Sequence, residues 1–129
     1  MKIIGIGVDI IQNKRIIIAL KNKTFINRTF GKQEILYSKK ILNKINYFAK
    51  RFAAKESLAK AIGTGFRDGL RFKDIQVLNN KLGKPYYILD KKLKTLISNK
   101  RNIKNFDLFL SISDEKEYSI AFTMIQSIK

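Results

Sequence analysis

Hydrophobic and polar residues alternate at both ends of the chain, and a period of two residues is typical of strands with two different faces. In residues 2–10, bulky aliphatic side chains occupy every second position, while the opposite face is almost bare until it presents Asp9. In residues 106–113, apolar side chains again fall on one side, and residues 118–128 form a last hydrophobic stretch. We therefore predict strands at residues 2–10, 106–113 and 118–128, the last two joined by a charged turn.

A period of three to four residues, which is typical of helices, dominates the middle of the chain. The clearest case is residues 47–62, which are rich in alanine, lysine, phenylalanine and leucine, contain no proline and are followed by Gly63. Residues 11–20 and a short segment around residues 32–40 are also predicted to be helical. Asp90 is placed to cap a further helix that carries Leu93, Leu96 and Ile97.

Two shorter strands are predicted at residues 72–78 and 85–89, because the asparagines and the glycine between them suit a hairpin connection. The resulting order β-α-α-β-β-α-β-β predicts an α+β fold with a mainly antiparallel sheet packed against helices. No linker, repeat or change of composition divides the chain, so we expect residues 1–129 to form a single domain.

Two absent residue types restrict the possible chemistry. The chain contains no histidine and no cysteine, which excludes Ser-His-Asp and Cys-His catalysis, disulfides and thiolate metal sites. Acid-base and metal chemistry must then fall to the 10 carboxylates, and carboxylates favour hard cations such as Mg²⁺.

The formal net charge is +17, from 27 lysines and arginines against 10 acidic residues. Such a surface attracts polyanions, among them nucleic acids, membranes, nucleotides and acidic proteins. Drift towards AT-rich codons is an equally good explanation, because lysine, isoleucine and asparagine are abundant together. No apolar run is long enough to span a bilayer and no signal-peptide pattern follows Met1, so we expect a cytoplasmic protein.

The first strand carries a glycine-rich pattern, Gly5-Ile6-Gly7-Val8-Asp9-Ile10. It is not a dinucleotide-binding loop, because Ile10 stands where the third glycine is needed and the pattern lies within the strand. The glycines leave room beside Asp9 for a ligand or for another backbone. The alternative is a surface aspartate that ends the strand and caps the next helix.

The long helix places Glu56 on a stripe with small residues, and Lys60 lies one turn further along, directed towards the glycine loop at residues 63–65. A carboxylate for a metal beside an ammonium for a phosphate suits a magnesium-phosphate substrate. The alternative is an ordinary solvated pair of charges on a helix, worth about 0.3 kcal/mol.

Two further segments are candidates for ligand binding. Gly83, Lys84 and Pro85 combine close backbone approach, charge and a stiff turn. Ser111, Ser113 and Asp114 follow in the strand at residues 106–113 and directly after it; the serines bind phosphate or simply form the wet face of a sheet.

Taken in order, these segments resemble the motifs of the bacterial holo-acyl carrier protein synthases, the small class of the 4′-phosphopantetheinyl transferases. The resemblance spans nearly the whole chain and rests on Gly5-Ile6-Gly7-Val8-Asp9-Ile10 with Arg15, Arg51-Phe52-Ala53-Ala54-Lys55-Glu56, Lys60-Ala61, Gly63-Thr64-Gly65, Asp74-Ile75, Gly83-Lys84-Pro85 and Ser111-Ile112-Ser113-Asp114-Glu115 with Tyr118. Two positions depart from the family pattern: Asp114 stands where many members carry histidine, and Ser119 replaces a usual alanine.

The resemblance implies an enzyme of fatty acid biosynthesis. It transfers 4′-phosphopantetheine from coenzyme A to a serine of apo-acyl carrier protein and releases 3′,5′-ADP. It further implies that Asp9 and Glu56 hold Mg²⁺, with Lys60 as the third catalytic residue.

Substrate and partner sites are also implied by the resemblance. Coenzyme A would be bound by Arg51, Lys60, Gly63, Thr64, Gly65, Gly83, Lys84, Pro85 and Ser111. Arg15 and Arg28 would dock the acidic carrier protein, and the protein would be a homotrimer with active sites between subunits. Neither nucleic acid nor a membrane is then expected as a partner.

Two alternatives stay open at this point. A small RNA-binding protein is supported by the basic charge and by phenylalanines and tyrosines scattered along the chain. A structural trimer without activity is the other, although the presence of both Asp9 and Glu56 favours an active enzyme.

Overall fold

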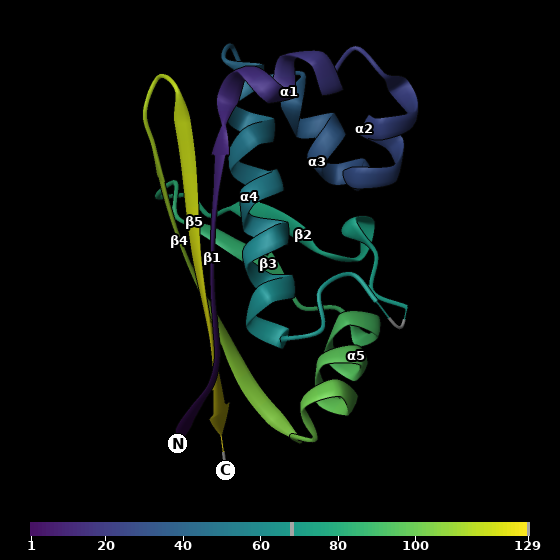
Figure 1. Ribbon diagram of the computed structural model, residues 1–129, viewed down its shortest axis with the longest axis vertical. Coiled ribbons are helices and arrows are strands. Elements are labelled where there is room, and N and C mark those ends of the chain that lie inside the picture. The colour runs from purple at the N-terminus through teal and green to yellow at the C-terminus, as the bar shows by residue number, and fades with distance from the viewer. Residues whose placement is uncertain (68, 129) are drawn as a thin grey trace.

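The computed structural model of the protein describes residues 1–67 and 69–128. Its largest sheet has three antiparallel strands in the order β1-β5-β4. These are β1 (Lys2–Gln12), β4 (Asn105–Asp114) and β5 (Tyr118–Ile128). The two ends of the chain therefore lie at the same end of the sheet (Figure 1). The predicted α+β class with antiparallel pairing is confirmed.

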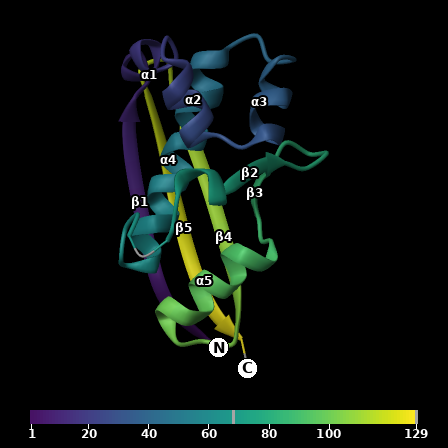
Figure 2. The same cartoon turned by 90° about the vertical axis from the view of Figure 1, so that its right-hand side faces the viewer.

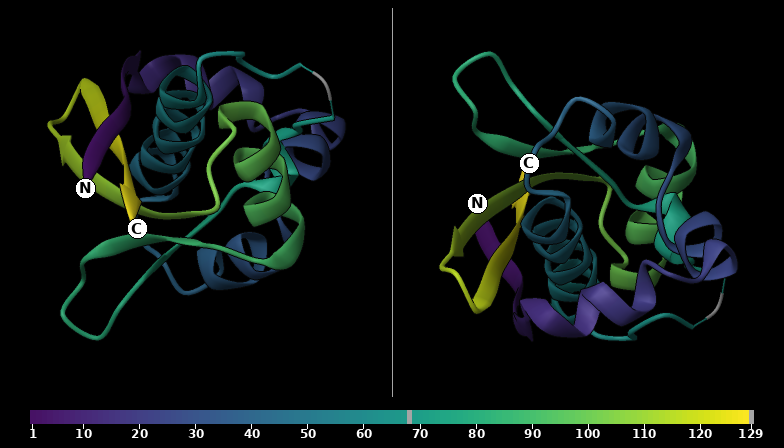
Figure 3. Two further views of the ribbon diagram at one scale, coloured as in Figure 1. Left: turned by 90° about the horizontal axis from the view of Figure 1, so that it is seen from below. Right: turned by 90° about the horizontal axis from the view of Figure 1, so that it is seen from above.

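Helix α4 (Lys44–Ile62) packs along one face of this sheet, and α1 (Asn13–Ala19), α2 (Lys23–Thr29) and α3 (Lys32–Ser38) gather near its N-terminal end. The last helix, α5 (Lys91–Arg101), lies at the opposite end (Figure 2). Viewed along the long axis, α4 runs between the sheet and the other helices (Figure 3). Among the residues that the structure describes, helices thus cover one face of the sheet and none covers the other.

Glycines allow β1 and α4 to approach backbone to backbone. A Cβ atom at Gly5 would overlap the carbonyl oxygen of Ala61, and one at Gly7 would overlap the carbonyl oxygen of Ser57. The sequence predicts room beside Asp9 for a ligand or another backbone. In the structure the backbone of α4 fills that room. The bulky side of β1, including Ile6 and Val8, faces away from the helices and is exposed.

A second, two-stranded sheet is formed by β2 (Gln76–Asn79) and β3 (Pro85–Ile88), paired antiparallel as the predicted hairpin. Its tip projects from the body of the molecule (Figure 3). The predicted strand at residues 72–78 is only partly correct, because it begins as a 3-10 helix, η1 (Phe72–Asp74). There the carboxylate of Asp74 accepts a bond from the backbone N–H of Arg71 at 3.0 Å, which favours a turn over an extended strand.

Several predicted helix ends agree with the structure. Helix α4 ends at Gly63, whose φ of 96° is the left-handed conformation that favours glycine. The carboxylate of Asp90 accepts a hydrogen bond from the backbone N–H of Leu93 at 2.8 Å and caps α5. Helix α2 was not predicted; its cap is Asn22, whose side chain accepts from the backbone N–H of Thr24 at 2.9 Å.

A buried ion pair connects three elements in the interior. Lys55 Nζ lies 2.7 Å from Glu34 Oε1, and neither side chain is exposed. Lys55 also donates to the carbonyl oxygens of Phe72, at 3.1 Å, and Ile75, while Glu34 Oε2 accepts from the backbone N–H of Val77 at 3.1 Å. A buried pair is tolerated when its remaining hydrogen-bonding groups are satisfied, as they are here. The pair therefore joins α3, α4 and the start of β2.

Within the part of the chain that the structure describes, none of the helices combines the length and the apolar character needed to cross a bilayer.

Candidate active site

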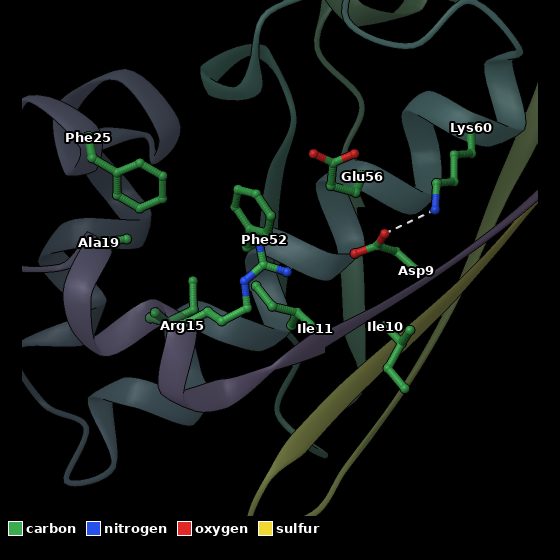
Figure 4. A pocket seen from close by; sticks show the side chains of 10 residues that line it. Asp9, Ile10, Ile11, Arg15, Ala19, Phe25, Phe52, Glu56 and Lys60 are labelled. Atoms are coloured by element: carbon green, nitrogen blue, oxygen red, sulfur yellow. Dashed lines mark hydrogen bonds and ion pairs between the residues drawn. The ribbon is translucent and has the colours of Figure 1, made fainter.

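Asp9 and Lys60 form the central contact of the site. Because side chains alternate along β1, Asp9 shares the inner face with Gly5 and Gly7 and points towards α4. Lys60 Nζ donates to Asp9 Oδ1 at 3.0 Å and to the carbonyl oxygen of Val8 at 3.0 Å (Figure 4). The sequence predicts that Lys60 points towards the glycine loop at residues 63–65. This prediction is wrong, because β1 lies close to α4 and the carboxylate of Asp9 pairs with Lys60 instead.

Glu56 lies one turn before Lys60 on α4 and points into the same cavity (Figure 4). Burial raises the pKa of its carboxyl group, and the negative charge of Asp9 raises it further, whereas Lys60 lowers it. The carboxylates of Asp9 and Glu56 therefore lie close together, near the ammonium group of Lys60. The predicted grouping of Asp9, Glu56 and Lys60 agrees with the structure, and the role of each residue stays a prediction.

A cavity of about 430 Å³ opens beside these three residues. Arg15 of α1 and the rings of Phe25 and Phe52 also line it, so the predicted carrier-docking arginine lies beside the carboxylates. The strand-to-helix connection explains this placement, because α1 begins one residue after β1 ends. A charged site therefore has one apolar wall and one basic wall.

A larger cavity of about 850 Å³ shares Phe25 and Phe52 with the first. The rings of Phe66 and Phe72 stack there with centroids 3.8 Å apart, and Arg28 lies on its border. The two cavities are therefore neighbours that share an aromatic wall, and together we call them the aromatic groove. Among these rings, only Phe52 belongs to a motif that the sequence singles out, because the others come from separate loops and helices.

Arg51 lies on another side of α4, away from this groove. It is 4% exposed, its guanidinium lies 3.7 Å from the centre of the Tyr47 ring, and it donates to the side chain of Asn79. Burial lowers the pKa of Arg51, and nearby Tyr47 and Glu34 oppose this shift. Among the described side chains, its Nε is the one buried nitrogen or oxygen with no hydrogen-bond partner.

A cavity of about 450 Å³ adjoins Arg51 and is lined by Lys50, Asn79, Gly83 and Asp114 among others. The side chain of Asn79 donates to the carbonyl oxygen of Gly83 at 2.8 Å, which joins the hairpin to the arginine. Lys84 and Pro85 follow directly, Pro85 as the first residue of β3. Two of the predicted coenzyme A segments therefore meet here, on a basic cavity with a buried, incompletely paired arginine.

The remaining predicted coenzyme A residues lie elsewhere in the chain. Thr64 is held by α5, since Lys100 Nζ donates to its hydroxyl oxygen at 2.9 Å, and Gly63 and Gly65 flank it after α4. Ser111 pairs with Phe122 in the sheet and is exposed. Within one chain the predicted coenzyme A residues are thus divided among several faces.

The sequence model of the 4′-phosphopantetheinyl transferase superfamily matches residues 5–123. The chain belongs to this superfamily. The resemblance carried by its motifs is therefore confirmed, and so is the prediction of a phosphopantetheinyl transferase of the holo-acyl carrier protein synthase type.

Similar members of the superfamily match the chain over nearly its full length. The holo-acyl-carrier-protein synthase of Pelagibacter ubique is 56% identical, over 98% of this chain and 98% of its own. The crystal structure of the Neisseria meningitidis enzyme has a TM-score of 0.86 at 37% identity and covers 97% of this chain and 99% of its own. The Bacillus anthracis enzyme, solved in complex with CoA (3′,5′-ADP), has a TM-score of 0.82 at 33% identity, over 99% and 100% of the two chains.

The acidic residues of this phosphopantetheinyl transferase fit a hard divalent cation. Asp9 and Glu56 offer carboxylate oxygens, and the ammonium of Lys60 already shows that the place accepts positive charge. In residues 1–67 and 69–128 no group of three or more potential metal ligands occurs. A cation held by these two carboxylates would therefore take its other ligands from water or substrate phosphate.

Proposed function

We propose that the protein transfers 4′-phosphopantetheine from coenzyme A to a serine of an apo-acyl carrier protein, releases 3′,5′-ADP, and serves fatty acid biosynthesis in the cytoplasm. The observation that carries this proposal is the close grouping of Asp9, Glu56 and Lys60 beside a cavity that Arg15 also lines. The proposed metal ligands, the lysine proposed to bind phosphate and the arginine proposed to contact the acidic carrier protein then line one cavity. The family of the chain supports the same reaction.

Asp9 and Glu56 would hold Mg²⁺. When bound, such a cation supplies charge neutralisation at a diphosphate. The chain's own residues do the rest: Lys60 contacts a phosphate oxygen, and the aromatic walls reduce the access of water to the cavity. Phosphoryl transfer depends mainly on positioning and electrostatic stabilisation, so this small set of side chains is sufficient.

In the transfer, the serine oxygen forms a bond to the β-phosphorus of coenzyme A, while the bond from that phosphorus to the bridging oxygen of 3′,5′-ADP breaks. The serine proton must pass to an oxygen, either of a carboxylate or of water, because the chain has no histidine. The leaving diphosphate oxygen becomes a terminal phosphate oxygen of 3′,5′-ADP.

The nucleotide end of coenzyme A would bind at the cavity beside Arg51, Gly83, Lys84 and Pro85. A buried guanidinium with an unpaired Nε provides charge for a phosphate in a place from which most water is excluded. The aromatic groove, which Phe52 and Phe72 line, suits the uncharged pantetheine arm.

The carrier protein would dock against α1 and α2. Arg15 lines the cavity of the carboxylates and Arg28 borders the adjoining one, so both arginines lie on the side from which a serine must enter. Acidic carrier proteins complement a chain with a net charge of +17.

A homotrimer with active sites between subunits is supported by the uncovered face of the sheet. Ile6, Val8 and Ile10 are 62%, 55% and 60% exposed, and the register places Val8 beside Phe122 and Ile10 beside Ile120 on β5. A contiguous apolar surface of this kind marks a protein interface. Ser111 lies on the same face. A second copy packed against this face would place its own residues beside Ser111, so that predicted coenzyme A residues that lie apart in one chain could come together between two chains.

The reaction is tested by intact-mass spectrometry of an apo-acyl carrier protein incubated with the enzyme, coenzyme A and Mg²⁺. We expect a mass gain of one phosphopantetheine, which EDTA abolishes. Asp9→Ala and Glu56→Ala should each lower the rate by about 100-fold or more, with a circular-dichroism spectrum like that of the parent. Glu117→Ala removes an exposed carboxylate from the turn between β4 and β5, and is the matched control with unchanged rate. Absence of any mass gain with several carrier proteins and a folded enzyme would refute the proposal.

A further inference from the structure

The ammonium of Lys60 lies where a metal ion bound to Asp9 would have to sit. Its ammonium lies 3.0 Å from Asp9 Oδ1 and 3.0 Å from the carbonyl oxygen of Val8. The Asp9 side chain is only 15% exposed, whereas that of Lys60 is 53% exposed. A fixed carboxylate is therefore paired with a cation that reaches it from solvent.

We propose that Lys60 is an exchangeable cation: it neutralises Asp9 until a divalent cation takes that carboxylate, and the displaced ammonium then binds a phosphate of coenzyme A. This inference rests on the function proposed above, because it takes Asp9 and Glu56 as the residues that hold the cation.

Competition follows from charge and space. An ammonium and a divalent cation repel one another, and both seek the same few carboxylate oxygens. Glu56, one turn away, is influenced by both partners, since Asp9 raises its pKa and Lys60 lowers it. In the described residues, Arg15 forms no ion pair with either carboxylate although it lines the same cavity, so Lys60 is the cation in direct contact.

The exchange requires only a side-chain movement. The backbone at Lys60 is fixed, because its neighbours Ala59 and Ala61 are buried and the carbonyl of Ala61 packs against Gly5. The ammonium is carried by a flexible four-carbon chain that is half-exposed, and such chains change rotamer within nanoseconds. Lys60 can therefore leave Asp9 without disturbing α4.

The exchange couples two binding events. A divalent cation at Asp9 releases an ammonium that has lost its partner, and a phosphate supplies a new one. Metal and coenzyme A should then each strengthen the binding of the other, since coupling between two ligands is reciprocal. Part of this coupling comes from direct contact between cation and phosphate, and the rest passes through Lys60.

The test measures Mn²⁺ binding by the electron paramagnetic resonance signal of free Mn²⁺, without carrier protein and hence without turnover. Lys60→Met should bind Mn²⁺ roughly 2–5-fold more tightly than the parent, which is the strength of a partly exposed ion pair. Arg15→Met is the matched control: it removes one positive charge from the same cavity but no contact with Asp9, so its effect should be clearly smaller. Thermal melts establish that both variants are folded.

A second measurement repeats the titration with coenzyme A present, which cannot react in the absence of carrier protein. Coenzyme A should tighten Mn²⁺ binding in the parent, and the factor should be smaller in Lys60→Met. Equal Mn²⁺ affinity of parent and Lys60→Met, or an equal effect of Arg15→Met, overturns the exchange.

The same titration separates this inference from the proposed function. If Asp9→Asn binds Mn²⁺ as well as the parent does, the metal site itself is wrong. If Asp9→Asn abolishes binding while Lys60→Met leaves it unchanged, the metal site stands and only the exchange fails.

Discussion

At Glu56 the polypeptide holds a carboxylate in an unfavourable place. Burial and the charge of Asp9 both raise its pKa, and Lys60 offsets only part of this. The neighbouring Lys55 is more deeply buried but fully satisfied, with Glu34 and two backbone carbonyls as partners. Two adjacent residues of one helix thus differ: the buried ammonium of Lys55 has three hydrogen-bond partners, while Glu56 costs stability at a site where charge is needed.

Glu56→Gln should therefore raise the melting temperature at neutral pH, because it removes a carboxylate that burial and Asp9 destabilise. A carboxyl group with a raised pKa in the folded state takes up protons more readily than in the unfolded state, so its unfavourable contribution disappears at low pH. The increase in melting temperature should be complete at pH values above the raised pKa of Glu56. It should be absent at pH values below 4.5, the ordinary pKa of a glutamate. Differential scanning calorimetry from pH 4 to about pH 8 measures it.

Glu117→Gln serves as the control for this measurement, because Glu117 is exposed in the turn between β4 and β5 and its replacement should leave the melting temperature nearly unchanged. A melting temperature that falls for Glu56→Gln at neutral pH would show that the carboxylate stabilises the fold instead.

At the scale of elements, the contact between β1 and α4 positions the whole site. Asp9 lies on β1, whereas Glu56 and Lys60 lie on α4, and the three meet because Gly5 and Gly7 let the two backbones touch. A side chain at either glycine would push the strand away from the helix. The glycines therefore matter for spacing, and not for an unusual backbone conformation.

Gly7→Ala should destabilise the fold by about 1–3 kcal/mol or more, the usual cost of inserting atoms into a well-packed region. It should also lower the transfer rate, because Asp9 moves relative to Glu56. Urea denaturation and the mass-spectrometric assay measure the two effects.

Gly31→Ala is the control, since the atoms nearest to its new methyl group belong to the side chain of Gln76, which can move, whereas those at Gly7 belong to the backbone of α4; the φ of −76° at Gly31 suits any residue. If Gly7→Ala proves as mild as Gly31→Ala, the close approach of β1 and α4 is not required.

At the scale of the whole molecule, the proposed trimer would account both for the uncovered sheet face and for the division of the predicted coenzyme A residues among several faces. The face includes Ile6, Val8 and Ile10 from β1 and Ile120 and Phe122 from β5. A monomer would leave this surface in water, at a cost that burial against a second copy would remove.

If the protein is the proposed trimer, Val8→Lys should convert it into monomers, because three lysines would have to be buried in an apolar interface. We expect sedimentation equilibrium to show one chain per particle and the transfer rate to fall to background. Leu42→Lys, at a fully exposed position before α4, should leave both unchanged. A monomer with full activity would contradict the placement of active sites between subunits.

The charge of +17 predicts a strong salt dependence of carrier-protein recognition. With coenzyme A kept saturating, KM for the carrier protein should rise as ionic strength increases from about 0.05 M to about 0.5 M, because screening weakens attraction between exposed charges. Replacing Arg15 and Arg28 by glutamine should flatten this dependence. A flat response in the parent enzyme would mean that its excess charge plays no part in docking and reflects composition alone.

The sequence by itself determined the local features of this protein. Periods of two and of three to four residues gave the main strands and α4, Gly63 and Asp90 marked helix ends, and the order of short motifs indicated the family. These features depend on neighbouring residues, so a single chain displays them directly. Helix α2 and η1 were not predicted, because no hydrophobic period marks them; the side chains of Asn22 and Asp74, which accept hydrogen bonds from nearby backbone N–H groups, are their local signals.

Only the tertiary structure decided which face of each element is buried and which distant residues meet. It turned the aliphatic side of β1 outward and its glycines inward, paired Lys60 with Asp9, buried Lys55 against Glu34, and placed Arg51 beside Asn79 on a face away from the carboxylates. Each of these outcomes depends on packing between segments separated by about 20 residues or more, and the free energy of that packing is a property of the assembled fold and not of any local stretch.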